Sequence, residues 1–391
     1  MFYFIGTKKV IKFINAKYIP VAEMKTITAK ELINNNDKSL LIVDIRQPDN
    51  FKGWNINGSQ NIDVYNDVWE GNFEAVKGKL SKLPKDKKII TVCNAGVTSQ
   101  NASMLLESMG YETLVLEKGM LGWNALHQSA DVINEKDLLL KQVIRVGKGC
   151  LSYLIISNST KECFVVDPSQ FVEEYLEIAK ENGFKIIGVI ETHVHADHLS
   201  GAGTLSQLTK TKYYVSGKDF KAKADFVDLD KLDEIPLGQN KIKILKTPGH
   251  TDGSLCFLID DKALLTGDTL FLEGIGRPDL GRNKDEVTKG AKILFNTLIT
   301  IKNLDKNLIV LPAHFTDYSD FPIHEKLGNL LKNNKSLKFN SESEFVDYIL
   351  KNLPMTPPNY EQIKNFNNNF AQIPRQMAEQ LEFGPNRCAS K

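Results

Sequence analysis

The sequence predicts an α/β protein with two separately folded domains and a helical C-terminal extension. The chain has 391 residues, which is long enough for two domains that each bury a core. Short apolar runs bounded by glycine, proline or polar residues recur along it, and such runs are typical of buried strands. Several of these runs lead directly into residues that carry chemistry. Loops at one edge of a sheet bring such residues together, so we expect a sheet scaffold with functional loops.

The charge balance limits the partners of the chain. Its 49 basic and 48 acidic side chains give a net charge of +1, so no strong field favours nucleic acid or an anionic membrane. We expect neither partner and no membrane-spanning segment, and association into a homo-oligomer is left open. Cysteines without paired spacing favour a reducing cytoplasm. They are Cys93, Cys150, Cys163, Cys256 and Cys388.

Residues 1–23 form an N-terminal extension whose status the sequence leaves open. The stretch is apolar and basic, but it lacks the uninterrupted apolar region and the cleavage site of a signal peptide. The first domain is predicted to span 24–130 and begins with Thr28-Ala29-Lys30-Glu31, the pattern of a helix capping box. The polar stretch 130–137 is expected to connect it to the second domain.

Cys93 is the candidate nucleophile of the first domain. It lies between a strand-like run, 88–90, and a stretch predicted to be a helix, 100–109. A cysteine in such a turn faces converging backbone N–H groups and the positive end of the helix dipole, and both stabilise the thiolate. An isolated cysteine is more often a small buried residue than a nucleophile, so the surrounding sequence has to decide between these two roles.

That surrounding sequence resembles the rhodanese domain. The resemblance covers about 24–128 and is carried by Asp44-Ile45-Arg46, by 51–62 and by 118–123, with Lys118-Gly119 at the start of the last. It implies a parallel sheet with flanking helices, and a loop cysteine, here Cys93, that carries sulfur as a persulfide. The loop 94–98 has no charged side chain, which argues against thiosulfate as a direct substrate and leaves backbone N–H groups to hold an anion.

The run Thr192-His193-Val194-His195-Ala196-Asp197-His198 indicates a metal site. Three imidazoles and a carboxylate fall within six residues, although the chain has only seven histidines. Imidazoles and carboxylates are ligands that zinc and iron prefer. The alternative is a solvated histidine-rich turn, which does not explain why the apolar run 186–190 leads straight into it.

Three further candidate ligands each follow a short apolar run. His250 comes after 242–245, Asp268 after 263–265, and His314 after 308–311. Taken singly, either histidine would more often be a hydrogen-bonded core residue. Taken together with the histidine-rich run, the four strand-end positions favour a metal.

At these positions the chain resembles the metallo-β-lactamase superfamily. The resemblance implies a second domain, 138–331, with the αββα sandwich of two mixed sheets packed face to face and helices outside. It also implies two metal positions at one edge. The first corresponds to His193, His195, His250 and Asp268, and the second to Asp197, His198, His314 and the shared Asp268.

Within this superfamily the chain resembles the persulfide dioxygenases. The resemblance is carried by 149–154, 267–271 and 276–280. It implies one iron(II) per chain in a triad that leaves three coordination positions open, enough for oxygen and a substrate sulfur. The implied ligands are His193, His250 and Asp268, with His195, Asp197, His198 and His314 orienting ligands and handling protons.

The same resemblance implies that Arg277 binds the carboxylates of a thiol such as glutathione, against the alternative of a surface ion pair. Dioxygenases often carry a tyrosine two residues after the last histidine, where this chain has Thr316, with Tyr318 beyond it. The identity of the thiol carrier is therefore left open.

Three functions follow from these readings. The first is oxidation of a small persulfide to sulfite at iron, coupled to sulfur transfer through Cys93. The second is thioester hydrolysis of the glyoxalase II type with two zinc ions per chain. The third is a sulfur carrier with an inert metal domain.

The extension 332–391 is expected to be helical, with one helix at 342–353 capped by Ser341 and another at 360–370.

Overall fold

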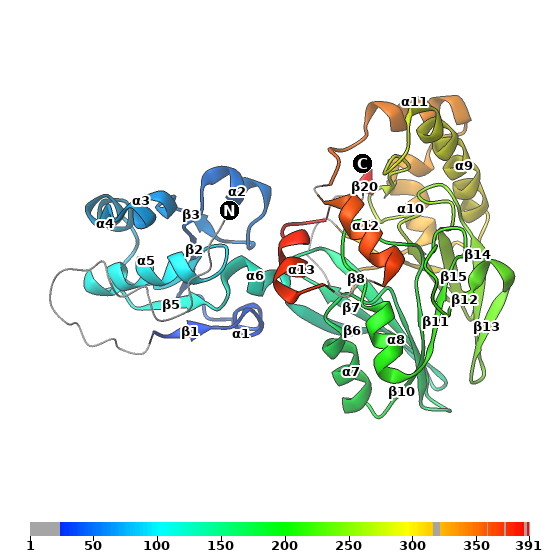
Figure 1. The fold of residues 1–391 in the computed structure, drawn as a ribbon, viewed down its shortest axis with the longest axis horizontal. Helices are drawn as coiled ribbons and strands as arrows, with labels where there is room; N and C mark the ends of the chain where they lie inside the picture. Colours follow the sequence, from blue (N-terminus) through cyan, green and yellow to red (C-terminus); the bar gives the residue numbers. More distant parts are fainter. Residues whose placement is uncertain (1–23, 316–320, 358, 371–372, 387–388, 391) are drawn as a thin grey trace. The chain divides into compact units, whose positions relative to one another are not determined.

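The protein is described by a computed structural model that covers residues 24–315, 321–357, 359–370, 373–386 and 389–390. The extension 1–23, Thr316, Tyr318 and Cys388 lie outside these residues. The chain divides into two compact units, of which the first comprises 57–119 and the described residues up to Phe51. The second comprises 52–56 and the residues from Met120 onward, and Figure 1 shows the elements of both.

The first unit contains a five-stranded parallel sheet with the strand order β1-β5-β4-β2-β3. Its central strand β4 is apolar and almost entirely buried, as expected for a parallel strand covered on both faces. The predicted parallel sheet with flanking helices is thus confirmed (Figure 1). The strands are β1 (Thr26–Ile27), β2 (Leu40–Asp44), β3 (Gln60–Asn61), β4 (Lys88–Val92) and β5 (Thr113–Leu116).

Helix α1 begins at the predicted capping box, whereas α5 begins at Val97 rather than at the predicted position 100. In α1 the Thr28 hydroxyl accepts a hydrogen bond from the Glu31 amide at 3.1 Å, and the Glu31 carboxylate accepts one from the Thr28 amide at 2.8 Å. The capping box is therefore confirmed. The helices are α1 (Ala29–Ile33), α2 (Pro48–Gly53), α3 (Tyr65–Glu70), α4 (Phe73–Leu80), α5 (Val97–Ser108) and α6 (Gly119–Asn124).

The first sheet of the second unit has seven strands in the order β12-β11-β10-β9-β8-β7-β6. It is mixed, since β6 to β9 pair antiparallel while β9 to β12 pair parallel. The strands are β6 (His127–Asn134), β7 (Leu138–Arg145), β8 (Cys150–Ser157), β9 (Glu162–Val166), β10 (Lys185–Ile190), β11 (Lys212–Val215) and β12 (Val227–Asp228).

The second sheet has six strands in the order β13-β14-β15-β16-β18-β19 and is also mixed, with β16 and β18 parallel. A two-stranded ribbon joins β17 to β20. The strands are β13 (Glu234–Leu237), β14 (Asn240–Lys246), β15 (Leu255–Ile259), β16 (Ala263–Gly267), β17 (Ile275–Gly276), β18 (Ile309–Pro312), β19 (Glu325–Lys326) and β20 (Ala389–Ser390).

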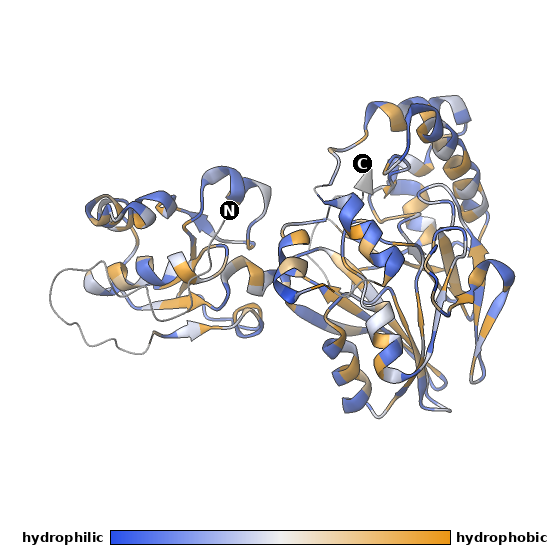
Figure 2. Ribbon diagram, viewed as in Figure 1, coloured by the Kyte–Doolittle hydropathy of each residue, from blue (hydrophilic) through white to orange (hydrophobic). Residues whose placement is uncertain are grey.

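The two sheets pack face to face around a shared apolar core. This core joins side chains of the first sheet, such as Phe164, to side chains of the second, such as Phe257. Two further clusters bury the outer faces of the sheets against helices, and Figure 2 shows the apolar residues concentrated on the strands. The predicted αββα sandwich is confirmed. The helices of this unit are α7 (Val172–Glu181), α8 (Ala202–Thr209), α9 (Lys284–Lys302), α10 (Leu327–Asn333), α11 (Glu342–Lys351), α12 (Tyr360–Asn369) and α13 (Arg375–Leu381), with 3₁₀ turns at Leu229–Lys231 and Lys335–Leu337.

The stretch 130–137, predicted to be a connector, lies largely within strand β6. The first sheet of the second unit therefore begins before the predicted boundary at 138. The reason is that β6 is an edge strand with alternating exposed polar residues, such as Ser129 and Asp131, so its sequence resembles a polar linker. Helix α11, capped by the Ser341 hydroxyl, and helix α12 lie where they were predicted. No described helix is long and apolar enough to cross a membrane.

Candidate metal centre and cysteine loop

Three of the predicted ligands converge at one edge of the sandwich. His193 follows β10, His250 follows β14, and Asp268 comes directly after β16. The Asp268 Oδ2 atom lies 3.7 Å from His193 Nε2 and 3.6 Å from His250 Nε2. All three residues are buried, and their ligand atoms lie within 4.8 Å of one another. The geometry is that of a three-ligand site.

Hydrogen bonds at the far nitrogen hold both imidazoles in a ligating orientation. His250 Nδ1 donates to the Arg277 carbonyl oxygen at 2.7 Å. His193 Nδ1 lies 2.9 Å from the Thr192 hydroxyl, which itself donates to Asp167 at 2.8 Å. Such bonds fix the ring and leave Nε2 with its lone pair toward the cluster.

The electrostatics of this group favour the ligating forms. Burial lowers the pKa of His193 well below its usual value and also lowers that of His250. Burial alone would raise the pKa of Asp268, but the neighbouring His314 and His193 hold it below the usual range. Neutral imidazoles and an ionised carboxylate are the forms that bind a metal.

Unpaired polar atoms also point to a cation at this place. His193 Nε2 and Asp268 Oδ2 are buried and have no hydrogen-bond partner among the described residues. A buried polar atom without a partner costs free energy unless a ligand or ion satisfies it. The donor set of two imidazoles and one carboxylate fits iron(II) or zinc.

His195 does not join this group. Its Nε2 lies 3.3 Å from Asp167 Oδ1, a carboxylate that also accepts the Thr192 amide at 2.7 Å. Burial alone would lower the pKa of His195, but Asp167 and Glu191 raise it overall. Sequence reasoning missed Asp167, although it follows the apolar strand β9 just as the chosen ligands follow theirs.

Asp197, His198 and His314 form a second group, joined by Cys150. His314 Nε2 lies 2.8 Å from Asp197 Oδ2, and His198 Nδ1 lies 3.1 Å from Asp197 Oδ1. Cys150 was not predicted to be a site residue, although it begins strand β8 within the motif 149–154. The structure thus places three of the predicted ligands in the triad and three others, together with Cys150, in a second group, while His195 belongs to neither.

Arg277 already has intramolecular partners. Its Nε donates to Asp279 Oδ1 and one of its terminal nitrogens to Asp279 Oδ2, both at 2.7 Å. It also donates to the carbonyl oxygens of Met355 and Pro354. To bind a substrate carboxylate, the buried guanidinium would have to exchange these partners, so its substrate role stays a prediction.

The C-terminal extension holds the backbone of the histidine-rich loop. The Asn367 amide on α12 donates to the carbonyl oxygens of His195 and His198, both at 2.8 Å, and its oxygen accepts the Ser200 amide at 2.9 Å. Glu382, fully buried, accepts the Leu199 amide at 2.5 Å. No sequence signal separates these two residues from the polar residues around them.

In the first unit, Cys93 lies at the C-terminal end of β4, before helix α5. The thiol is buried, and its sulfur accepts the Ser99 amide at 3.4 Å and lies 3.3 Å from the Ser99 hydroxyl. A Cβ atom at Gly119 would come within 2.1 Å of the Cys93 carbonyl oxygen, so only glycine fits against this turn. The strand–loop–helix setting predicted for Cys93 is present.

The Asp44-Ile45-Arg46 motif of the first unit forms a buried ion pair. The Arg46 side chain contacts both carboxylate oxygens of Asp44, with distances down to 2.7 Å. Asn61 donates to the carbonyl oxygens of both residues.

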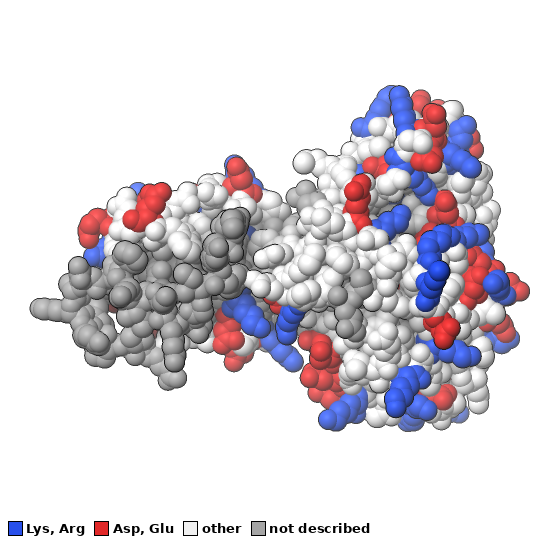
Figure 3. All heavy atoms as spheres, in the orientation of Figure 1, with Lys and Arg blue, Asp and Glu red and all other residues white. Residues whose placement is uncertain are grey.

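On the face of the molecule that Figure 3 shows, acidic and basic side chains of the second unit are intermixed.

Comparisons with known proteins agree with this architecture. Residues 28–126 match the family model of the rhodanese-like domain, and residues 145–314 match that of the metallo-beta-lactamase superfamily. The structure of a metallo-beta-lactamase from Staphylococcus aureus subsp. aureus COL superposes with a TM-score of 0.57 at 30% identity, covering 62% of this chain and 75% of that one.

Two relatives with named activities are similar to part of this chain. Persulfide dioxygenase ETHE1, mitochondrial, of Mus musculus is 29% identical over 180 residues, which are 45% of this chain and 68% of that protein. A hydroxyacylglutathione hydrolase of Prochlorococcus marinus is 34% identical over 166 residues, 39% of this chain and 61% of that protein. The two relatives correspond to the first two functions that the sequence predicts.

Proposed function

The chain belongs to the metallo-β-lactamase superfamily and carries a rhodanese-like domain, and from this premise we propose that it is a persulfide dioxygenase coupled to sulfur transfer. In the proposed reaction a small persulfide, dioxygen and water give the free thiol, sulfite and two protons. Glutathione persulfide or a similar species is the proposed substrate. The cytoplasm is the proposed location.

The observation that carries this proposal is the neighbour of His195 Nε2. The His195 ring lies 4.3 Å from that of His193, but its Nε2 atom lies 3.3 Å from Asp167 Oδ1. A hydrolytic first site of this superfamily would use this nitrogen as a third imidazole ligand. Two histidines and Asp268 alone would hold one iron(II), which supplies adjacent open positions for oxygen and a sulfur ligand when bound. Similarity to the mouse persulfide dioxygenase supports the same choice.

The residues of the chain prepare this site for the reaction. Burial of the triad excludes water from the ligands, and the Arg277 carbonyl and Thr192 hydroxyl keep the two rings from rotating. His314 Nδ1 lies 2.6 Å from Asp268 Oδ1, whereas Asp268 Oδ2 faces the two triad histidines. Asp268 can then bind through its other oxygen.

Cys93 would carry out the sulfur transfer without any change in oxidation state. The thiolate attacks the outer sulfur of a sulfane donor, the bond to the donor's inner sulfur breaks, and Cys93 keeps a persulfide while the donor leaves as a thiol or sulfite. The Ser99 amide, which already points at the sulfur, would stabilise the charge of the persulfide. Transfer in the reverse direction, from the Cys93 persulfide to a thiol or sulfite, also leaves the oxidation states unchanged.

A zinc thioester hydrolase is the second candidate. It is favoured by the group around Asp197, which could complete a two-metal site, and by the similarity to the hydroxyacylglutathione hydrolase. Such an enzyme would use about two zinc ions and a bridging hydroxide and would consume no oxygen.

Metal analysis and oxygen uptake distinguish the two candidates. Protein purified without oxygen should hold about one iron per chain, and with glutathione persulfide it should consume oxygen and release sulfite. His250→Ala should abolish both oxygen uptake and iron binding, because one of the three metal ligands is lost. His324→Ala is the matched control, since His324 is exposed and away from both groups. Unchanged uptake in His250→Ala, or two zinc ions with thioester hydrolysis, would overturn the proposal.

A further inference from the structure

The carboxylate of Asp219 contacts both loops that carry the histidines of the triad. Asp219 follows β11, on a turn in which its amide donates to the Ser216 carbonyl oxygen at 3.2 Å. Its Oδ2 accepts the Thr251 hydroxyl at 2.5 Å and the Val194 amide at 3.5 Å, and its Oδ1 accepts the Gly253 amide at 2.8 Å. One carboxylate therefore joins a loop of the first sheet to a loop of the second.

These contacts bracket the first histidine of the triad. Just before His193, the Thr192 carbonyl oxygen accepts the Leu255 amide at 2.9 Å. Leu255 begins β15, the strand that follows the loop of His250. Just after His193, the next amide is bound by Asp219. The two imidazoles are thus held with their ring centroids 4.9 Å apart and their planes at 87°.

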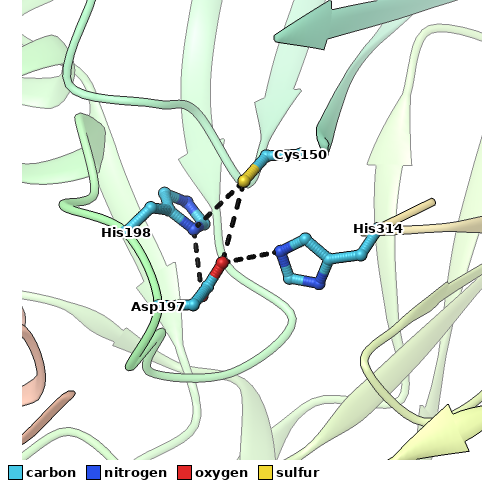
Figure 4. Close-up of side chains that lie close together, drawn as sticks. All are labelled: Cys150, Asp197, His198 and His314. Carbon is cyan, nitrogen blue, oxygen red and sulfur yellow. Dashed lines mark hydrogen bonds and ion pairs between the residues drawn. The ribbon is translucent and has the colours of Figure 1, made fainter. Parts of the chain in front are cut away.

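The triad depends on such a connection more than the second group does. In the second group the Asp197 carboxylate lies 3.1 Å from His198 and 2.8 Å from His314, and Figure 4 shows these side chains in direct contact. In the triad the two imidazoles stay 3.6 and 3.7 Å from the Asp268 carboxylate. Before a metal binds, the geometry of the triad is therefore set mainly by the main chain of its loops.

The residues around Asp219 allow this close approach and fix the carboxylate in place. A Cβ atom at Gly253 would come within 2.7 Å of Asp219 Cγ, so a larger residue there would displace the carboxylate. On helix α12 the Asn368 amide donates to the Asp219 carbonyl oxygen at 3.3 Å, and its side-chain oxygen accepts the Lys221 amide at 2.7 Å. Both the side chain and the main chain of Asp219 are thus held.

We propose that Asp219 is a positioning residue of the triad, which sets the separation of His193 and His250 through the main chain of their loops. Ligands have to be held within about 0.5 Å of the geometry that a metal requires. Asp219 bonds to residues adjacent to both histidines, so a shift of its carboxylate moves one loop relative to the other. The inference rests on the triad as a metal site, and not on which reaction the site catalyses.

Asp219→Asn in the full chain tests this role. The substitution keeps the size of the side chain but turns an NH₂ group toward one set of its donors. The metal-free protein is titrated with cobalt(II) without oxygen, in competition with a chelator, and the visible bands report the geometry of the ligands. The bands that are missing in His193→Ala belong to the triad. In Asp219→Asn these bands should shift, and cobalt affinity at the triad should fall at least about tenfold, because hydrogen bonds to a charged acceptor are lost.

Asp230→Asn is the matched control. Asp230 accepts the Ser216 hydroxyl at 2.6 Å and the Lys218 amide at 3.2 Å, so it holds the same turn through other bonds. This variant should keep the bands and the affinity of the wild type. Thr251→Val removes one donor to Asp219 and should show part of the effect, whereas Thr251→Ser should behave as the wild type does. The Thr251 pair also tests the proposal if Asp219→Asn does not fold.

The triad bands decide the outcome. Unchanged bands and affinity in Asp219→Asn would overturn the proposal, and a lower free energy of unfolding alone would assign Asp219 to the fold. An equal change in Asp230→Asn, or a wild-type spectrum that His193→Ala leaves unaltered, would overturn it as well. Failure of the proposed reaction would instead appear as absent oxygen uptake by the iron-loaded wild type, with the effect of Asp219→Asn on the cobalt bands intact.

Discussion

Replacing Asn367 by alanine should weaken metal binding, although the residue touches no candidate ligand atom. Its side chain makes three hydrogen bonds to the main chain of the histidine-rich loop, at 2.8, 2.8 and 2.9 Å. Each such bond contributes about 0.5–1.5 kcal/mol net, so the total is about 1.5–4.5 kcal/mol. If this free energy is lost from the metal-binding conformation of the loop, the affinity falls roughly tenfold to a thousandfold.

The measurement is competition for cobalt or iron against a chelator of known affinity, combined with urea unfolding of the metal-free chain. Asn369→Ala is the matched control, because Asn369 is exposed on the same helix and bonds only to Asn365. We expect the control to bind as the wild type does. Equal metal affinity in Asn367→Ala and the wild type would refute the view that the C-terminal extension positions the loop.

The sequence was informative where a residue's neighbours along the chain determine its place. A strand with apolar residues precedes each of four predicted ligands, so their meeting at one edge of the sandwich could be predicted; these are His193, His250, Asp268 and His314. The turn that holds Cys93 could be predicted for the same reason, because β4 and α5 flank it directly.

Residues that reach the site from elsewhere could not be predicted in this way. Asn367 and Glu382 lie about 170 to 180 residues beyond the loop whose amides and carbonyls they bind, and each is one polar residue among many in an amphipathic helical tail. Cys150 lies in a strand that is buried along its whole length, and a free cysteine often occupies such a position simply as a small apolar residue. Its significance depends on the distances to Asp197 and His198, which only the fold supplies.

The grouping of the ligands also required the structure. Spacing alone makes His193 and His195 equivalent, because alternate residues of an extended loop can face the same side. The structure distinguishes them through Asp167, whose backbone adopts a left-handed φ of 51° and whose carboxylate lies 3.3 Å from His195. The choice between a triad and a larger site therefore depends on a residue with no motif of its own.

Three further predictions test the two units separately. Cys93→Ser should abolish the sulfur added by a sulfane donor, read by mass spectrometry, yet keep oxygen uptake from preformed persulfide; loss of both with the fold intact would contradict the division of labour. Arg277→Ala should raise KM for the persulfide by roughly tenfold to a hundredfold with the metal content unchanged, since a charge-assisted hydrogen bond contributes about 1.5–3 kcal/mol. An unchanged KM with a lower free energy of unfolding would assign Arg277 to its ion pair with Asp279 alone. His127 should make the second unit sensitive to acid, because burial lowers the pKa of this imidazole from 6.5 to about 3. The unfolded chain then binds a proton that the folded chain does not bind, so stability falls as the pH drops below about 6.5, by about 2.5 kcal/mol between about pH 7 and about pH 4.5. Urea unfolding of His127→Gln at both pH values should show a correspondingly smaller loss, whereas an equal loss in the variant and the wild type would show that other groups cause the acid sensitivity.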